Sequence, residues 1–315
     1  MTPALHGAAS VDMPDKKAYS GSMQAQTEKD CTIGVRHNRW PSIIFLCGIS
    51  AVALIVCPLY LIFYGIRPGT VLLFLGMCVS TVTAITAGYH RLYAHSAYRA
   101  NAFYRFLMLA FGAATFQQSA LKWASLHRTH HQYTDTERDP YNIKKGFFYA
   151  HVGWILFYLR SIDFSNVKDL EKSKLIMNQH RHFQLWAIGF GVVMPVIIGA
   201  LYGQVLEALL FGVAARMFVI FQVTFFINSF AHSYGVDTFG GGTSARDNWI
   251  GAILTGGEGY HSFHHRFPAD YRNGVLWHHW DPSKWFIWTA GRLGWAWDLK
   301  RTPPSRILEA RLFPA

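Results

Sequence analysis

Four long apolar segments constrain this chain more strongly than any other feature. They lie at residues 42–64, 69–88, 185–202 and 205–227. A helix rises about 1.5 Å per residue, so roughly 20 residues cover the hydrocarbon core of a bilayer, which is about 30 Å thick. The link between the first two segments and the link between the last two are very short. The sequence therefore predicts an all-α integral membrane protein with four transmembrane helices in two hairpins.

Composition and charge distribution agree with a membrane protein. Hydrophobic residues make up 51% of the chain and charged residues only 15%, whereas soluble domains carry about 25% charged residues. The formal net charge is +11, yet of the 29 Lys and Arg residues only Arg67 and Arg216 lie in a short link or inside a span. Basic residues gather on the cytosolic side of membranes. Both termini and the long polar segments are therefore expected to be cytosolic, and nucleic-acid binding is not expected.

The chain divides into one main unit and two tails. Residues 1–40 are polar and predict a cytosolic, disordered tail. Residues 41–302 predict a single unit, in which 89–184 and 228–302 form a cytosolic helical cap that holds a dinuclear metal site. Residues 303–315 are interpreted as a C-terminal tail.

Three features within these regions need a separate explanation. The apolar segments at 103–116 and 147–159 are too short or too interrupted to cross a bilayer, so they are expected at the interface or as braces for the cap. Arg216 lies well inside the fourth predicted span, where a charge is costly. It is expected to contact a functional polar site, to face the helix bundle or to reach outward to water.

Histidines are grouped where the predicted spans end. The three groups are His90 with His95, then His127, His130 and His131, and then His261, His264 and His265. In a helix, residues i, i+3 and i+4 share one face, but the last two point about 100° apart. Adjacent histidines therefore reach two different ions more easily than one. His90 and His95 are spaced for neither pattern, so the helix is expected to bend or end between them.

These groups predict a dinuclear metal site built from imidazole. His232 follows the fourth span and is expected to join the site, with Asn228 one turn earlier on the same face. The sequence contains neither an H-E-x-x-H nor a C-x-x-C zinc motif. Ligand type alone does not choose between iron, copper and zinc. The other histidines are not expected to bind metal: His6, His37, His151, His180, His182, His278 and His279.

Longer motifs around these histidines resemble the membrane-bound fatty acyl desaturases. They are GYHRLYAH at 88–95, KGFFYAHVGW at 145–154, NSFAH at 228–232 and GEGYHSFHHRFP at 257–268. The resemblance is strongest to the acyl-CoA Δ9, or stearoyl-CoA type, branch, and it suggests a bacterial member located in the inner membrane. It implies an enzyme that uses O2 to introduce a cis double bond into a saturated acyl chain.

The resemblance also implies two iron ions and a set of ligands. One iron would be held by His90, His95, His127, His131 and His264. The other would be held by His130, His232, His261 and His265, with Asn228 contacting it through water. Electrons would come from a separate protein, either a b-type cytochrome or a ferredoxin with its reductase.

A bent tunnel for the acyl chain is a further implication of the resemblance. Gln117, Trp123 and Thr224 match positions that line the bend, and Cys78 lies near the closed end, where a vertebrate relative has Tyr. Vertebrate relatives contact the CoA portion through Arg-Asp directly before the second histidine group, where this chain has Ser125-Leu126, and they have Asn in place of Gln118. Acyl-CoA is the favoured substrate, and acyl-ACP or a phospholipid acyl chain are alternatives.

Two other functions are compatible with the histidine groups. A membrane hydroxylase would use the same metal scaffold on the same kind of substrate. A metal transporter or metal sensor would also concentrate histidines, but transport sites usually lie near the middle of the membrane. The predicted position at the ends of the spans favours the desaturase.

Overall fold

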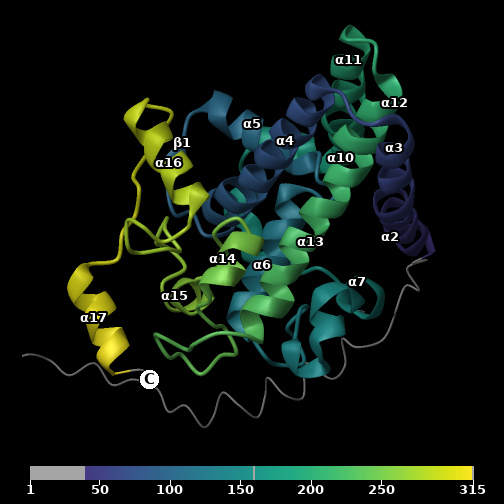
Figure 1. The fold of residues 1–315 in the computed structure, drawn as a ribbon. Helices are drawn as coiled ribbons and strands as arrows, with labels where there is room; N and C mark the ends of the chain where they lie inside the picture. The colour runs from purple at the N-terminus through teal and green to yellow at the C-terminus, as the bar shows by residue number, and fades with distance from the viewer. Residues whose placement is uncertain (1–39, 159, 314–315) are drawn as a thin grey trace, which may run out of the picture. The chain divides into compact units, whose positions relative to one another are not determined.

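The computed structural model describes residues 40–158 and 160–313, which form helices joined by loops and one short two-stranded sheet (Figure 1). The tail predicted at residues 1–40 lies outside this part of the chain, apart from Trp40. The described residues confirm the predicted all-α fold class with four helices long and apolar enough to cross a membrane.

These four helices run over Trp40–Tyr64, Pro68–Ala94, Phe183–Leu201 and Val205–His232. The second and the fourth continue past the predicted ends at 88 and 227. Apolar composition stops at the edge of the bilayer, but helical hydrogen bonding continues into the polar region. Both extensions carry histidines, so the spans themselves contribute residues to the candidate metal site.

Each span combines α-helical and π-helical segments. The first contains α2 (Trp40–Ala51), η1 (Val52–Val56) and α3 (Cys57–Tyr64), and the second α4 (Pro68–Thr83) and η2 (Ala84–Ala94). The third contains α10 (Phe183–Ile188), η6 (Gly189–Val193) and α11 (Met194–Leu201). The fourth contains α12 (Val205–Glu207), η7 (Ala208–Ala215), α13 (Arg216–Ser229) and the 3-10 turn η8 (Phe230–His232). The π-helical segments free carbonyl groups from the regular i to i+4 pattern.

The spans differ in how far they are buried by the rest of the protein. In the most apolar part of each span, 67% of the residues of the fourth are buried, against 6% for the first. The fourth span is therefore central, and the first exposes most of its surface. Figure 1 shows the connection between α11 and α12 at one end of the molecule, far from α6 and α15.

The segment between the hairpins folds into β1 (Arg99–Ala100), α5 (Ala102–Ala113), α6 (Ala120–Tyr133), η3 (Ile143–Lys145), η4 (Tyr149–Gly153), α7 (Trp154–Phe157), η5 (Phe164–Val167), α8 (Lys168–Glu171) and α9 (Lys174–Arg181). Helix α5 covers most of the apolar segment predicted as a brace. It packs against α4 and η2 of the second span and α10 and η6 of the third.

The segment after the fourth span folds into α14 (Trp249–Leu254), α15 (His261–Arg266), α16 (Pro282–Arg292), β2 (Ala296–Trp297) and α17 (Pro304–Leu312). Strand β2 pairs antiparallel with β1, with Arg99 opposite Trp297 and Ala100 opposite Ala296. Helix α17 lies in the predicted C-terminal tail, and its Ala310 is buried in a cluster with Phe239 and Phe263.

Candidate metal centre

Nine histidines from four separate segments meet in one region of the structure. His90 and His95 lie at the end of the second span, and His232 lies at the end of the fourth. Helix α6 carries three more and α15 the last three. The Ser119 hydroxyl caps α6 by accepting a hydrogen bond from the Lys122 backbone N–H at 3.3 Å, which fixes where the helix begins.

The nine imidazoles form two groups, in each of which the ring nitrogens lie within 4.8 Å of one another. The group of five contains His90, His95, His127, His131 and His264. The group of four contains His130, His232, His261 and His265. Adjacent histidines in α6 and in α15 belong to different groups. The structure therefore brings these residues together in the arrangement expected from the 100° separation, while their binding of iron stays a proposal.

Distances within the groups suit a shared metal ion. The Nε2 atoms of His90 and His264 are 2.9 Å apart and those of His95 and His127 2.8 Å apart. In the second group, Nε2 of His261 lies 3.0 Å from that of His232 and 3.1 Å from that of His265. Neighbouring ligands of an octahedral metal at about 2.1 Å lie about 3.0 Å apart. The donor set and its spacing therefore fit two transition-metal ions.

The two groups adjoin each other through stacked rings. His131 of the first group and His265 of the second have ring centroids 4.2 Å apart and planes 18° from parallel. His130 and His131 come from consecutive positions of α6 but belong to different groups. Two metal ions held by these groups would be neighbours, as a dinuclear site requires.

The helix ends at Ala94, between His90 and His95, as the sequence predicts, but its last segment is π-helical and not α-helical. Segment η2 is π-helical through Ala94, and the His95 backbone N–H donates to the His90 carbonyl oxygen at 3.1 Å. A π-helical turn joins residue i to i+5, so residues five apart lie on one face. The ring centroids of the two histidines are consequently only 4.9 Å apart.

Carboxylates and a hydroxyl orient three of the imidazoles from behind. Nδ1 of His90 lies 2.9 Å from Glu258 and Nδ1 of His130 lies 2.8 Å from Asp139. Nδ1 of His232 lies 2.7 Å from the Ser244 hydroxyl. Such partners fix the tautomer so that Nε2 keeps its lone pair for a metal. Sequence reasoning missed all three, although Glu258 lies inside the GEGYH motif.

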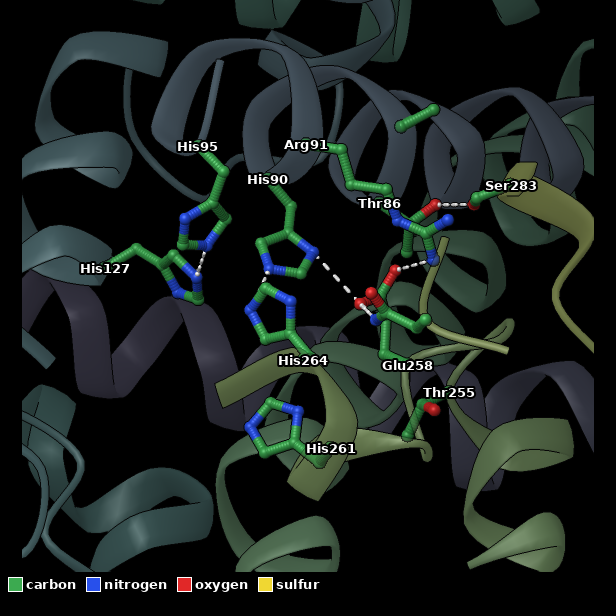
Figure 2. Close-up of polar contacts among 12 residues, drawn as sticks. Thr86, His90, Arg91, His95, His127, Thr255, Glu258, His261, His264 and Ser283 are labelled. Atoms are coloured by element: carbon green, nitrogen blue, oxygen red, sulfur yellow. Dashed lines mark hydrogen bonds and ion pairs between the residues drawn. The ribbon is translucent and has the colours of Figure 1, made fainter. Parts of the chain in front are cut away.

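Glu258 links the metal region to a buried ionic network. Arg91 donates to Glu258 at 2.8 Å and lies 2.9 Å from Asp281, and none of the three side chains is more than 1% exposed. Figure 2 shows Glu258 between His90 and Arg91. Burial alone would raise the pKa of Glu258, but the nearby Arg91 and His90 lower it to about 2. The carboxylate therefore remains charged and able to accept the His90 hydrogen bond.

Burial favours the neutral form of imidazoles in both groups. Burial first, and then the positive charges of nearby histidines, lower the pKa of His261 to about 3. Burial is also the main reason that the pKa values of four others lie well below the usual range, namely His127, His131, His264 and His265. A neutral imidazole is the form that binds metal, so these side chains are prepared for coordination.

The residues expected around the acyl chain are partly brought together. The Gln117 side-chain amide donates to the Thr224 hydroxyl at 2.9 Å. Trp123 stacks on His127 with ring centroids 4.9 Å apart. Asn228 is half-buried one turn before His232, and Cys78 is half-buried in α4. The roles of these residues toward a substrate or a metal-bound water remain predictions.

The other histidines stay apart from the two groups. His151, His180, His182, His278 and His279 belong to neither, and His6 and His37 lie outside the described residues. His151 instead makes hydrogen-bond contacts with Ser229 at 2.9 Å and Gln222 at 3.1 Å.

The four apolar spans and the two imidazole groups define a helical membrane protein with a candidate pair of metal sites. The chain belongs to the fatty acid desaturase family, whose sequence profile matches residues 65–284. That family uses a metal centre, which agrees with the histidine groups.

Individual relatives support this membership. Acyl-CoA desaturase 1 of Saccharomyces cerevisiae is 38% identical over 288 residues, which is 87% of this chain and 54% of the relative. A probable acyl-CoA desaturase of Schizosaccharomyces pombe is 43% identical over 226 residues, or 71% of this chain and 47% of the relative. Stearoyl-CoA desaturase 4 of Mus musculus is 33% identical over 234 residues, or 71% and 65%.

These matches limit which properties of the relatives can be assigned to this chain. The chain spans about half the length of the two yeast relatives. Relatives named for Δ12 and Δ11 desaturation also match, so similarity alone does not fix the double-bond position. The relatives named above are eukaryotic and give no support to the predicted bacterial source.

Proposed function

We propose that this protein is an O2-dependent desaturase that introduces a cis double bond, at the Δ9 position, into a saturated chain carried as acyl-CoA. The observation that carries the proposal is the pair of imidazole groups directly beside Trp123, which stacks on His127. The family membership and the names of the relatives, most of them acyl-CoA desaturases, support the same reaction.

The two groups would hold two iron ions, which, when bound, supply the O2-dependent oxidation that removes two hydrogens from neighbouring methylenes. The protein contributes the arrangement around them. Burial lowers the pKa of imidazoles in both groups, among them His131 and His261, and so favours their neutral form. Glu258, Asp139 and Ser244 accept or share the Nδ1 hydrogen of His90, His130 and His232. The nearly complete burial of His90, His261 and His264 excludes bulk water, which protects an oxidising centre from side reactions.

Shape would choose the carbons that react. A methylene chain offers no polar group to recognise, so its position must come from the walls that surround it. Gln117 and Thr224 are joined by a hydrogen bond, and Trp123 lies against the first imidazole group. These three side chains would form the bend that presents one pair of carbons. Cys78, smaller than the Tyr of a vertebrate relative, would admit longer chains, which product profiles with C16, C18 and C20 acids would reveal.

A basic hollow supports a phosphate-bearing carrier such as CoA. It has a volume of about 410 Å³, and its lining includes Gln118, Lys122, His180, Arg181 and His182. One of its lining residues, Gln118, directly follows Gln117 in the chain. A CoA headgroup in this hollow would therefore lie close to the proposed bend of the acyl chain. By contrast, Ser125 is buried and donates to the Asp163 carbonyl oxygen at 2.7 Å. Position 125 therefore does not replace the arginine of vertebrate relatives.

A separate cytosolic protein, a b-type cytochrome or a ferredoxin with its reductase, would deliver the two electrons. The basic residues of the cap favour an acidic partner. The asymmetry of Lys and Arg supports a metal centre on the cytosolic side of the membrane. The membrane itself is proposed to be a bacterial inner membrane, from the resemblance stated for the sequence.

Expression in a host that lacks its own desaturase, followed by feeding of stearate, tests the proposal. Gas chromatography with mass spectrometry of derivatised lipids would locate any new double bond. Monoenes with the bond at carbon 9 support the full proposal, and another position corrects the Δ9 assignment. Hydroxy acids would indicate a hydroxylase on the same scaffold. Unchanged lipids with altered metal tolerance would indicate a transporter or sensor.

A further inference from the structure

Arg216 is a fully buried cation whose hydrogen bonds all go to backbone carbonyl oxygens in the described part of the chain. It is 0% exposed. Its guanidinium donates to Gly212 at 3.2 Å, to Ala114 at 2.5 Å and to Gly191 at 2.7 Å. A buried charge that is held only by dipoles is costly. Among the alternatives considered from the sequence, the structure shows that the side chain faces the bundle.

The three carbonyl groups come from positions where the helical pattern is interrupted. Ala114 is the C-cap of α5, and the last carbonyls of a helix lack partners within it. Gly191 lies in η6 of the third span and Gly212 in η7 of the fourth. A cation at the end of α5 also interacts favourably with the helix dipole. Arg216 thus ties α5, the third span and the fourth span together at one point.

The turn that follows Ala114 has an unusual backbone. Phe116 has φ of 59° and Gln118 φ of 77°, a region that side chains other than glycine rarely adopt. Such conformations persist only where the surroundings enforce them. A Cβ atom added at Gly191 would lie 2.7 Å from the Phe116 ring and 2.9 Å from the Ala114 carbonyl oxygen. The third span therefore presses closely on this turn, and Arg216 fixes its first residue.

The turn carries Gln117, whose amide reaches the fourth span again. It donates to Thr224 at 2.9 Å and to the Ile220 carbonyl oxygen at 3.4 Å. Arg216 and Thr224 both lie on α13, two helical turns apart, so the turn at 114–119 is attached to one helix at two points, Ala114 and Gln117. A change at the Arg216 attachment would shift Gln117 against Thr224.

We propose that Arg216 is a positioning residue, which holds the turn at 114–119 so that Gln117 and Thr224 set the carbon at which the double bond forms. This inference rests on the proposed desaturase function. Arg216 touches no substrate in this scheme. Its effect on the product passes through Gln117.

The test compares the full-length chain with its variants in a host without its own desaturase, fed palmitate or stearate, with product normalised to membrane-inserted protein. Arg216→Met is expected to lower product by on the order of tenfold to a hundredfold and to spread the remaining double bonds over neighbouring carbons. Gly191→Ala presses on the same turn and is expected to spread them too. Arg216→Lys keeps the charge but not the planar fork, so an intermediate pattern is expected.

Phe211→Ala is the matched control, because Phe211 is buried on the same span but contacts Tyr60 instead of the turn. It should lower the amount of protein without changing the double-bond position. A wild-type isomer pattern in Arg216→Met would overturn the positioning role. If that variant does not accumulate, wild-type patterns in both Arg216→Lys and Gly191→Ala overturn it. A wild-type chain that forms no monoene would instead refute the desaturase function.

Discussion

The two imidazole groups consist of the same side chain but are supported in different ways. Behind the first group, His90 contacts Glu258, which belongs to a fully buried network with Arg91 and Asp281. Behind the second group, His130 contacts Asp139, which also accepts from the Asp135 backbone N–H at 2.9 Å. The carboxylate behind His90 joins distant parts of the chain, whereas the contacts of Asp139 are made within residues 130–141.

A metal centre needs both a stable surrounding fold and correctly oriented ligands, and the contacts behind the two groups differ in which of these they serve. Asp281 is also the N-cap of α16 and accepts from the Lys284 backbone N–H at 3.0 Å. The network behind the first group therefore ties the second span to the C-terminal part of the cap. Ser244 and Asp135, behind the second group, are half-buried and joined at 2.6 Å. The buried network behind the first group is expected to contribute mainly to the stability of the fold. The contacts behind the second group are expected mainly to orient its imidazoles.

Removing one imidazole from either group gives the largest expected loss of activity. His264→Ala and His130→Ala should each reduce monoene formation to background, because each deletes one of the proposed ligands of its group. Both proteins should still insert in the membrane. Metal analysis of the purified variants, set beside that of the wild type, checks the assignment. Retained turnover in either variant would contradict it.

Arg91→Met should cause the largest loss of stability. It leaves the carboxylates of Glu258 and Asp281 buried without their cation, which typically costs about 3–5 kcal/mol. Thermal unfolding in detergent, followed by loss of the monodisperse protein, would measure the change. Arg99→Met is the comparison, since Arg99 is exposed and pairs with the half-exposed Asp298 and should matter far less. Equal effects in the two variants would remove the special role of the network.

Glu258→Gln and Asp139→Asn should separate the two supports. Each keeps the shape of the side chain but removes its charge, and loss of such partners typically weakens metal binding by about 10–100-fold. Glu258→Gln should also lower thermal stability, whereas Asp139→Asn should change metal affinity with little change in stability. Iron titration of the metal-free protein, combined with melting curves, measures both quantities. Identical profiles would erase the distinction between the groups.

Ser244→Ala should have the smallest effect. It removes a neutral hydrogen bond to His232, which is worth about 0.5–1.5 kcal/mol. The affinity of the second group for metal should fall by no more than about tenfold. Ser244→Thr, which keeps the hydroxyl, is expected to restore it. A complete loss of activity in Ser244→Ala would mean that the half-buried support is as important as the buried one.

The sequence predicts the spans and the histidine groups because both depend on local spacing. Apolar runs give the number of crossings, and the separation of His130 from His131 assigns them to different groups. The partners Glu258 and Asp139 could not be assigned in this way, because they meet His90 and His130 only after folding. The π-helical turn that aligns His90 with His95 was also missed, since α-helical geometry places residues five apart on different faces.

The helices that cross the membrane run without interruption into the metal centre. Pro68–Ala94 carries His90 at its end, and Val205–His232 carries His232. These two histidines belong to different groups. A change in bilayer thickness that tilts one span against the other is therefore expected to alter the separation between the groups. The distance between the two imidazole groups is therefore expected to differ between lipid bilayers and detergent micelles.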